Sequence, residues 1–227
     1  DNQKQRTNCT MTSPQPHEDL IGKLAVEFLL EVREREGENA VLDVLEAVSS
    51  IFGGWDLVEY RRAFADKRVV PVKRAKLLAV ELTQIISNLP IHFGLVLCRL
   101  AQPQISPGEQ RETGAYYTDF RLARDLAKSF VACWPLNGKL VDPACGTGVL
   151  LVSAVLEISG EDPRCIKNLL RHSIFGCDLS KNALRGARIA LGSLTDSIDT
   201  LCELDSHLLH QDSLIADSQI WRHYAPS

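Results

Sequence analysis

The sequence has no excess of positive charge, and this limits what it can bind alone. Lys and Arg number 25 against 29 Asp and Glu, which gives a net charge of −4 over 227 residues. A protein that held DNA by itself would normally be basic, because contacts to phosphates rely on Lys and Arg. If nucleic acid is a partner, we expect other polypeptide to supply most of the contacts.

Long apolar runs are also missing. No segment approaches the roughly 20 apolar residues of a membrane-spanning helix, and residues 1–19 are polar throughout, unlike a signal or transit peptide. We therefore expect no membrane partner. Because the only methionine is Met11, we take residues 1–16 as a disordered tail or a remnant of cloning or processing.

The cysteine spacing excludes two classes of small domain. The seven cysteines are an odd number, with no CxxC pair and no His/Cys spacing typical of a zinc site. A disulfide framework is equally unsupported. We therefore expect reduced thiols, a cytoplasmic protein and no metal.

What is present in the first half is apolar residues at helical spacing. We assign a helical domain to residues 17–104 and a linker to residues 105–113, within a stretch rich in proline, glycine and polar residues. Glycine and proline signals divide the domain into four predicted helices: Leu20 to a stop at Gly37, Asn39 to Gly53, Pro71 to Asn88, and Pro90 to Ala101.

The second half, residues 114–227, alternates helices with strands. A helix over "DFRLARDLAKSFVACW" could be capped by Thr118 or Asp119. Alternation of this kind predicts parallel strands joined by right-handed crossovers, the α/β class. The predicted strands and helices follow in order as Lys139–Asp142, Val149–Ser159, Ser173–Asp178, Lys181–Leu191 and Leu208–Asp212.

The stretch "LVDPACGTGVLL", residues 140–151, has the order strand, glycine turn, helix of an α/β nucleotide site. A dinucleotide fingerprint needs a small residue three positions after the second glycine, but Leu151 stands there. A P-loop needs Gly-Lys-Ser/Thr, but Gly148 is followed by Val149. Neither phosphate-binding pattern fits.

An acidic residue ends each predicted strand: Asp142, Asp178 in "IFGCDLS" and Asp212 in "LLHQDSL". The carboxyl ends of successive parallel strands line one crevice. A row of carboxylates repels phosphate and suits a ligand with an ammonium group, free ribose hydroxyls and an aminopurine. S-adenosylmethionine has all three and no phosphate. The alternative is that Asp178 and Asp212 only cap the turns after their strands.

Four motifs in this order resemble the adenine-specific (N6) DNA methyltransferases of restriction-modification systems, of type I or type IIG. They are "GAYYTDF", "DPACGTGVLL", "GCDLS" and "HQDSL", within Thr113–Leu214. The combination of "DPACGTG" with an upstream "GxYYT" is specific, whereas "GCD" or "QDS" alone is not. The resemblance implies a Rossmann-like S-adenosylmethionine-dependent methyltransferase fold, of which the chain contains the first three parallel strands.

The resemblance also implies a role for each motif. Tyr117 and Thr118 would close over the methionine end of the cofactor, and Asp142 would hold its ammonium group. Asp178 would accept hydrogen bonds from both ribose hydroxyls, and Asp212 would accept one from the adenine amine. Glycines in the turn would let the backbone approach the ligand. The remaining members of the implied cofactor-binding set are Tyr116, Ala144, Gly146, Thr147, Gly148, Leu179 and Ser213.

Two departures from that family stand out. Asp119 occupies the position after "YYT" where the family has proline. The Asn/Asp-Pro-Pro-aromatic motif, which positions the amine of a flipped-out base, is absent, and the sequence stops 15 residues after Asp212. We therefore expect the amino-terminal part of a larger enzyme, inactive alone, with no catalytic residue in this chain.

A sheet that ends with its first strand would expose a long edge. We expect a second copy of the chain, the helical half or further polypeptide to cover it. The implied partners are DNA through the full-length enzyme, a specificity or restriction subunit or domain, and a homodimer. Two alternatives remain: a protein-glutamine or RNA methyltransferase, and a non-catalytic methyltransferase-like assembly subunit.

Three other features have plain explanations. Cys145 is interpreted as a packing residue in the pocket rather than a nucleophile. Residues 61–76 contain seven basic residues and one acid, which either face solvent and balance the acidic first helices or contact DNA phosphates. His207 and His210 lie on a predicted strand without other ligands in register, so no metal is expected there.

Overall fold

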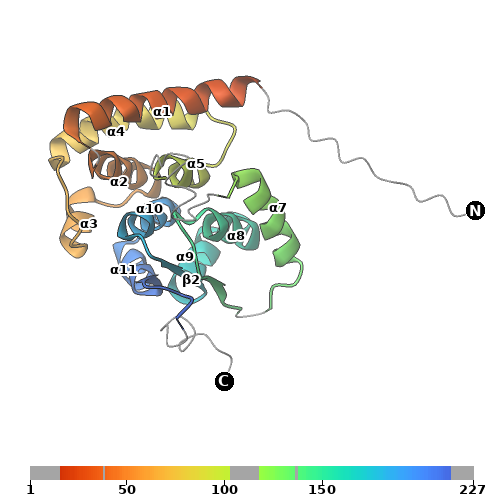
Figure 1. The fold of residues 1–227 in the computed structure, drawn as a ribbon. Helices are drawn as coiled ribbons and strands as arrows, with labels where there is room; N and C mark the ends of the chain where they lie inside the picture. Colours follow the sequence, from red (N-terminus) through yellow and green to blue (C-terminus); the bar gives the residue numbers. More distant parts are fainter. Residues whose placement is uncertain (1–15, 38, 103–117, 136–137, 216–227) are drawn as a thin grey trace, which may run out of the picture.

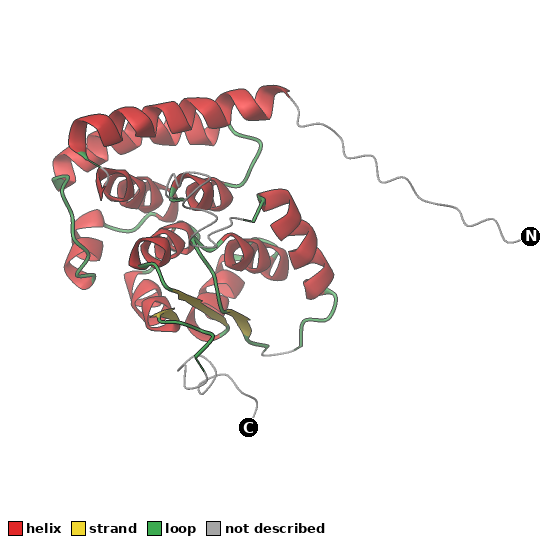
Figure 2. Cartoon of the chain, viewed as in Figure 1, coloured by secondary structure: helices red, strands yellow, loops and turns green. Residues whose placement is uncertain are grey.

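The computed structural model describes residues 16–37, 39–102, 118–135 and 138–215, with side chains from Lys23 onward. An all-helical half precedes an α/β half (Figure 1, Figure 2). The predicted linker, nearly all of the predicted tail, and both Tyr116 and Tyr117 lie outside the described residues.

The helical half contains the four predicted helices and a short one that was not predicted, α3. Helices α1 and α4 run side by side, and α2 and α5 pack between them and the α/β half (Figure 1). Pro71 stands at the N-cap of α4, one position ahead of its predicted place. The bounds are α1 Pro16–Glu36, α2 Asn39–Gly53, α3 Leu57–Ala63, α4 Val72–Ser87 and α5 Phe93–Leu100.

The α/β half follows the predicted order with two additions. Helices α9 and α11 were not predicted; α9 starts at Pro163, where Asp162 accepts the N–H of Arg164. Helix α7 is capped by Asp119. The elements are α7 Phe120–Val131, β1 Leu140–Asp142, α8 Val149–Ser159, α9 Pro163–His172, β2 Ile174–Asp178, α10 Lys181–Gly192, α11 Ile198–His207 and β3 Leu208–His210.

The three strands form one parallel sheet in the order β1-β2-β3, which confirms the predicted fold class. Val141 pairs with Phe175 and Cys177 pairs with Leu209. Strand β3 ends at His210, so Asp212 lies two residues beyond the strand rather than at its last position.

Helix α10 is the central helix of the molecule. Its residues from Ala183 to Gly192 are all buried, because α2 and α5 cover its outer side while β2 and β3 lie beneath it. Helices α9 and α11 pack against each other and against β2. One apolar core therefore runs through both halves of the described chain.

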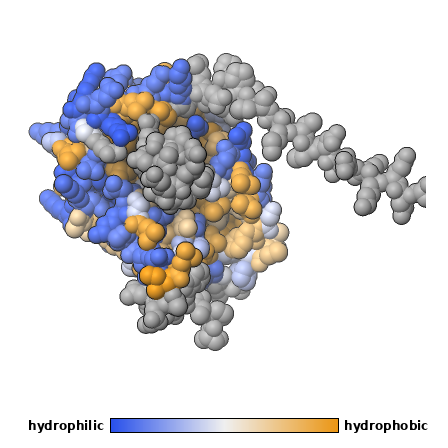
Figure 3. All heavy atoms as spheres, viewed as in Figure 1, coloured by the Kyte–Doolittle hydropathy of each residue, from blue (hydrophilic) through white to orange (hydrophobic). Residues whose placement is uncertain are grey.

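Helix α7 keeps an apolar stripe at the surface, where orange side chains gather in the place of this helix (Figure 3). Leu122, Leu126 and Phe130 recur every four residues and are 55%, 49% and 36% exposed. Within the described residues β1 pairs only with β2, so a cover for its other edge stays a prediction. No described helix combines the length and apolar character needed to cross a membrane.

Candidate cofactor site

The glycine turn joins the end of β1 to the start of α8. Cys145 donates its N–H to the carbonyl of Cys177 on β2 at 2.9 Å, and Gly148 donates to the carbonyl of Cys145 at 2.8 Å. Gly148, at φ 85°, is the N-cap of α8. These bonds fold the turn back over the carboxyl end of β2.

The two glycines are required for different reasons. Both have positive φ, which favours glycine. Among the residues that the structure describes, a Cβ on Gly146 would meet no atom within 4 Å, so none of them fills this side of the turn. A Cβ on Gly148 would lie 3.1 Å from Cβ of Ala187, so the space beside Gly148 is filled by α10. The open side at Gly146 is therefore where a ligand can approach the backbone.

Each of the three predicted carboxylates accepts a hydrogen bond from the backbone two residues further on. The bonds run from Ala144 N to Asp142 at 3.1 Å, from Ser180 N to Asp178 at 2.8 Å, and from Leu214 N to Asp212 at 2.9 Å. This is the turn geometry that aspartate favours. The capping role considered for Asp178 and Asp212 is thus present in the structure.

Asp178 also links the strand ends to one another. Its second carboxylate oxygen accepts the N–H of Gly146 at 2.9 Å, and its carbonyl accepts the N–H of Gln211 at 3.2 Å. The ends of β1, β2 and β3 are therefore gathered around this residue. An ionised carboxylate offers about four acceptor positions, so the two N–H groups do not use up its capacity.

The acids act on one another electrostatically. Burial, and then the charge of Asp178, raise the pKa of the Asp142 carboxyl, although the N–H of Ala144 opposes the shift. Burial, Asp142 and Asp178 together raise the pKa of Cys145 well above its ordinary value. Cys145 is 5% exposed. A buried thiol whose pKa is raised is a poor nucleophile, which favours the packing interpretation of this residue.

The other predicted site residues lie in varied surroundings. Thr147 is only 2% exposed, and its Cγ2 lies against Gly186 of α10. Ala144 and Leu179 are exposed, whereas Ser213 and Asp212 are half-buried. Thr118 is half-buried just before α7, and its part in cofactor binding stays a prediction.

Two residues that the sequence motifs did not identify contact the glycine turn. Gly186 and Ala187 form the surface against which the turn packs; their only sequence signal is a pair of small residues in a predicted helix. The His207/His210 pair does not share a strand, because His207 ends α11. The His207 ring lies against the Phe175 ring, with the ring centroids 4.4 Å apart and the planes tilted by 44°. Nε2 of His210 instead contacts the carbonyl of Leu179 at 2.9 Å.

No family model matches the chain, and no curated protein matches it. Among solved structures, it is similar to a protein of Listeria monocytogenes described as a proposed class I S-adenosylmethionine-dependent methyltransferase, with 15% identity and a TM-score of 0.48. The match covers 87% of this chain and 55% of the other, so the chain spans about half that protein's length. A similarity of this extent concerns the arrangement of helices and strands and assigns no activity.

Proposed function

We propose that the chain binds S-adenosylmethionine at the carboxyl ends of its three strands. The observation that carries the proposal is the bond from Gly146 N–H to Asp178. This bond joins a carboxylate that keeps free acceptor positions to a glycine turn whose outer side no described residue fills. Asp142 ends β1 and Asp212 lies two residues beyond β3, so the three acids stand at the carboxyl ends of neighbouring strands.

The donor set fits this cofactor. Asp142, half-buried, would hold the ammonium group, because its ionised form is costly until a cation approaches. Asp178 would accept ribose hydroxyls, and Asp212 would accept the adenine amine. The open side of Gly146 would let the ligand contact the backbone. When bound, S-adenosylmethionine supplies an electrophilic methyl group.

For the reaction, we propose the cofactor-binding portion of an N6-adenine DNA methyltransferase of a restriction-modification system. The support is the order of "GAYYTDF", "DPACGTGVLL", "GCDLS" and "HQDSL" along the sequence. No Asn/Asp-Pro-Pro-aromatic motif is present, so we assign cofactor binding and not methyl transfer to these residues. DNA, and a specificity or restriction subunit, would be partners of the whole enzyme.

Isothermal titration calorimetry tests the proposal directly. The chain is titrated with S-adenosylmethionine, with its demethylated product, and with ATP and NAD as adenine nucleotides that carry phosphate. We expect micromolar dissociation constants for the first two and much weaker binding of the phosphate-bearing pair, because the acids repel phosphate. Equal binding of all four, or binding of none, contradicts the proposal.

A second candidate, a non-catalytic assembly subunit, is favoured by one observation. All three acids already bond the backbone two residues on, as turn caps do without any ligand. If the acids serve only this purpose, the titration gives no heat, or heat only at millimolar ligand. The same experiment therefore separates the two functions.

A further inference from the structure

The second turn of α10, Arg185–Arg188, contacts the glycine turn and the helical half at the same time. Its two middle residues lie beneath the glycine turn. A Cβ on Gly186 would lie 3.1 Å from Cγ2 of Thr147, and Cβ of Ala187 lies 3.1 Å from the position that a Cβ on Gly148 would take. Any shift of this helical turn therefore shifts the glycine turn that rests on it.

Arg185, the first residue of that helical turn, is anchored in the helical half. Its Nη2 donates to Asp43 at 2.6 Å and to Glu46 at 2.8 Å, and its Nε donates to Glu46 at 3.0 Å. Both acids come from α2 and are fully buried. Burial works against the charge of Arg185, but Glu46 and Asp43 more than offset it, so the pKa of Arg185 is raised.

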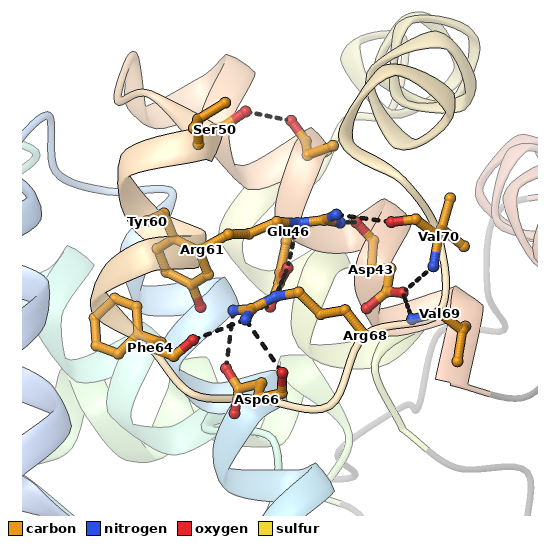
Figure 4. Close-up of polar contacts among 12 residues, drawn as sticks. Asp43, Glu46, Ser50, Tyr60, Arg61, Phe64, Asp66, Arg68, Val69 and Val70 are labelled. Atoms are coloured by element: carbon orange, nitrogen blue, oxygen red, sulfur yellow. Dashed lines mark hydrogen bonds and ion pairs between the residues drawn. The ribbon is translucent and has the colours of Figure 1, made fainter.

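The two acids are themselves held in place from other directions, as Figure 4 shows. Glu46 pairs with Nε of Arg68 at 3.0 Å and with Nε of Arg61 at 3.3 Å. The second oxygen of Asp43 accepts the N–H groups of Val69 and Val70, both at 2.7 Å. The acceptors that receive Arg185 are therefore fixed by the helical half.

Arg188, the last residue of the same helical turn, has a separate anchor. Its Nε donates to the hydroxyl of Tyr60 at 2.9 Å, and its two terminal nitrogens bond Asp66 and Asp205. Its Cζ lies 4.2 Å from the centre of the Phe64 ring. The whole cluster contains four arginines and four acids: Arg61, Arg68, Arg185, Arg188, Asp43, Glu46, Asp66 and Asp205.

A buried network of this kind is stable only in a narrow geometry, because each charge taken from water must keep its partners. We propose that the helical half positions the glycine turn through this cluster, with Arg185 as the positioning residue. The cluster fixes the second turn of α10, and that helical turn fixes Thr147 and Gly148 from below. The inference rests on the proposed function only where it takes the glycine turn as a cofactor contact.

Amide hydrogen exchange of the unliganded protein tests the positioning step. In Arg185→Lys the positive charge remains, but the planar guanidinium group that bonds both Asp43 and Glu46 is lost. We expect exchange at Gly146 and Gly148 to accelerate at least roughly fivefold, the lower end of ordinary coupling between sites. The control is Arg74→Lys, the same change in a pair with Glu36 (3.1 Å) that joins α4 to α1, which should leave both amides unchanged.

Gly186→Ala is the second variant, because it leaves every charge in place. Its new methyl group would stand 2.9 Å from Cβ of Ala101 and 3.1 Å from Cγ2 of Thr147, and so push on the turn directly. We expect the same acceleration at Gly146 and Gly148. This variant tests the second step alone, the contact between the helical turn and the glycine turn, and unchanged exchange in it overturns the inference even if Arg185→Lys does not fold.

Cofactor titration then measures the consequence for binding. Arg185→Lys and Gly186→Ala should each weaken binding of S-adenosylmethionine roughly tenfold, within the usual range of coupling, and Arg74→Lys less than twofold. Unchanged exchange at the turn in either variant, or acceleration spread evenly over all amides, overturns the inference. If the wild-type chain binds no cofactor, the proposed function fails, while the exchange data still decide the positioning step.

Discussion

The carboxylate of Asp178 accepts the N–H of Gly146 across a gap of 32 residues in sequence, at 2.9 Å. Its other oxygen accepts the N–H of Ser180 at 2.8 Å. The orientation of this carboxylate is therefore fixed before any ligand arrives. A ligand that uses its remaining acceptor positions would not have to order the side chain, which lowers the entropy cost of binding.

We predict that Asp178→Asn weakens S-adenosylmethionine binding by at least about tenfold, which is about 1.4 kcal/mol. The amide keeps one acceptor oxygen but loses the negative charge and turns an NH2 group toward an N–H. The measurement is calorimetric titration of folded protein. Asp162→Asn is the matched control, because Asp162 also accepts an N–H two residues on (Arg164, 3.2 Å) but caps α9 instead of ending a strand. Equal affinities for both variants would leave Asp178 with only a capping role.

A pair of glycines separates backbone strain from ligand contact. Gly146 and Gly160 have φ of 52° and 55°, and a Cβ on either would lie more than 4 Å from every other described residue. Gly146→Ala and Gly160→Ala should each lower the free energy of unfolding by roughly 1–2 kcal/mol, the cost of left-handed backbone for alanine. Only Gly146→Ala should also weaken cofactor binding, since its methyl group enters the proposed site. Urea unfolding and titration of the two variants check this; parallel losses of affinity would contradict it.

Much of the architecture followed from local patterns. Helix α8 was predicted with its observed bounds, because glycines precede and follow an apolar run from Val149 to Ser159. The acids after the strands were found because an aspartate after an apolar run is visible without a structure. Helices α9 and α11 were missed, although Asp162-Pro163 is a recognisable start signal.

Contacts between the two halves could not be predicted in the same way. The basic stretch that contains Arg61 and Arg68 was expected to face solvent or DNA. Arg61 and Arg68 are instead nearly buried, with side chains 10% and 13% exposed, and both pair with Glu46. Their partner lies on another helix, and Arg185 joins it from 139 residues away. Pairings between distant segments leave no periodic signal in a single sequence.

Two glutamates that each pair with an arginine Nε, Glu46 and Glu36, should differ greatly in how much they contribute to the free energy of unfolding. Glu46→Ala should lower the free energy of unfolding by about 3–5 kcal/mol, because it leaves buried arginines without a counter-charge. Glu36→Ala should cost less than about 1 kcal/mol, because its pair with Arg74 is partly exposed and screened by solvent. Urea unfolding of both variants measures the difference, and similar costs would show that the cluster is not strongly desolvated.

The raised pKa of Asp142 predicts how its contribution to the free energy of unfolding changes with pH. Below the ordinary value of 3.8, the carboxyl is protonated in both the folded and unfolded chain. As pH rises past 3.8, the unfolded chain loses this proton first, so the Asp142 contribution lowers the free energy of unfolding until pH passes the raised folded pKa. Asp142→Asn removes this contribution and keeps an acceptor for Ala144. The stability of wild type relative to Asp142→Asn should therefore fall with rising pH across that window.

The affinity for S-adenosylmethionine should change with pH in the direction opposite to stability, because both depend on the ionisation of Asp142. The ammonium group of S-adenosylmethionine needs the ionised form of Asp142, so affinity should rise with pH through the folded pKa and then level off. Binding in that window should also release a proton, because a bound cation favours the carboxylate. Calorimetry in buffers of different ionisation enthalpy detects that proton. Asp142→Asn should bind more weakly, with neither the pH dependence nor the proton release. A wild-type affinity that does not change across the window would mean that Asp142 does not contact the ammonium group.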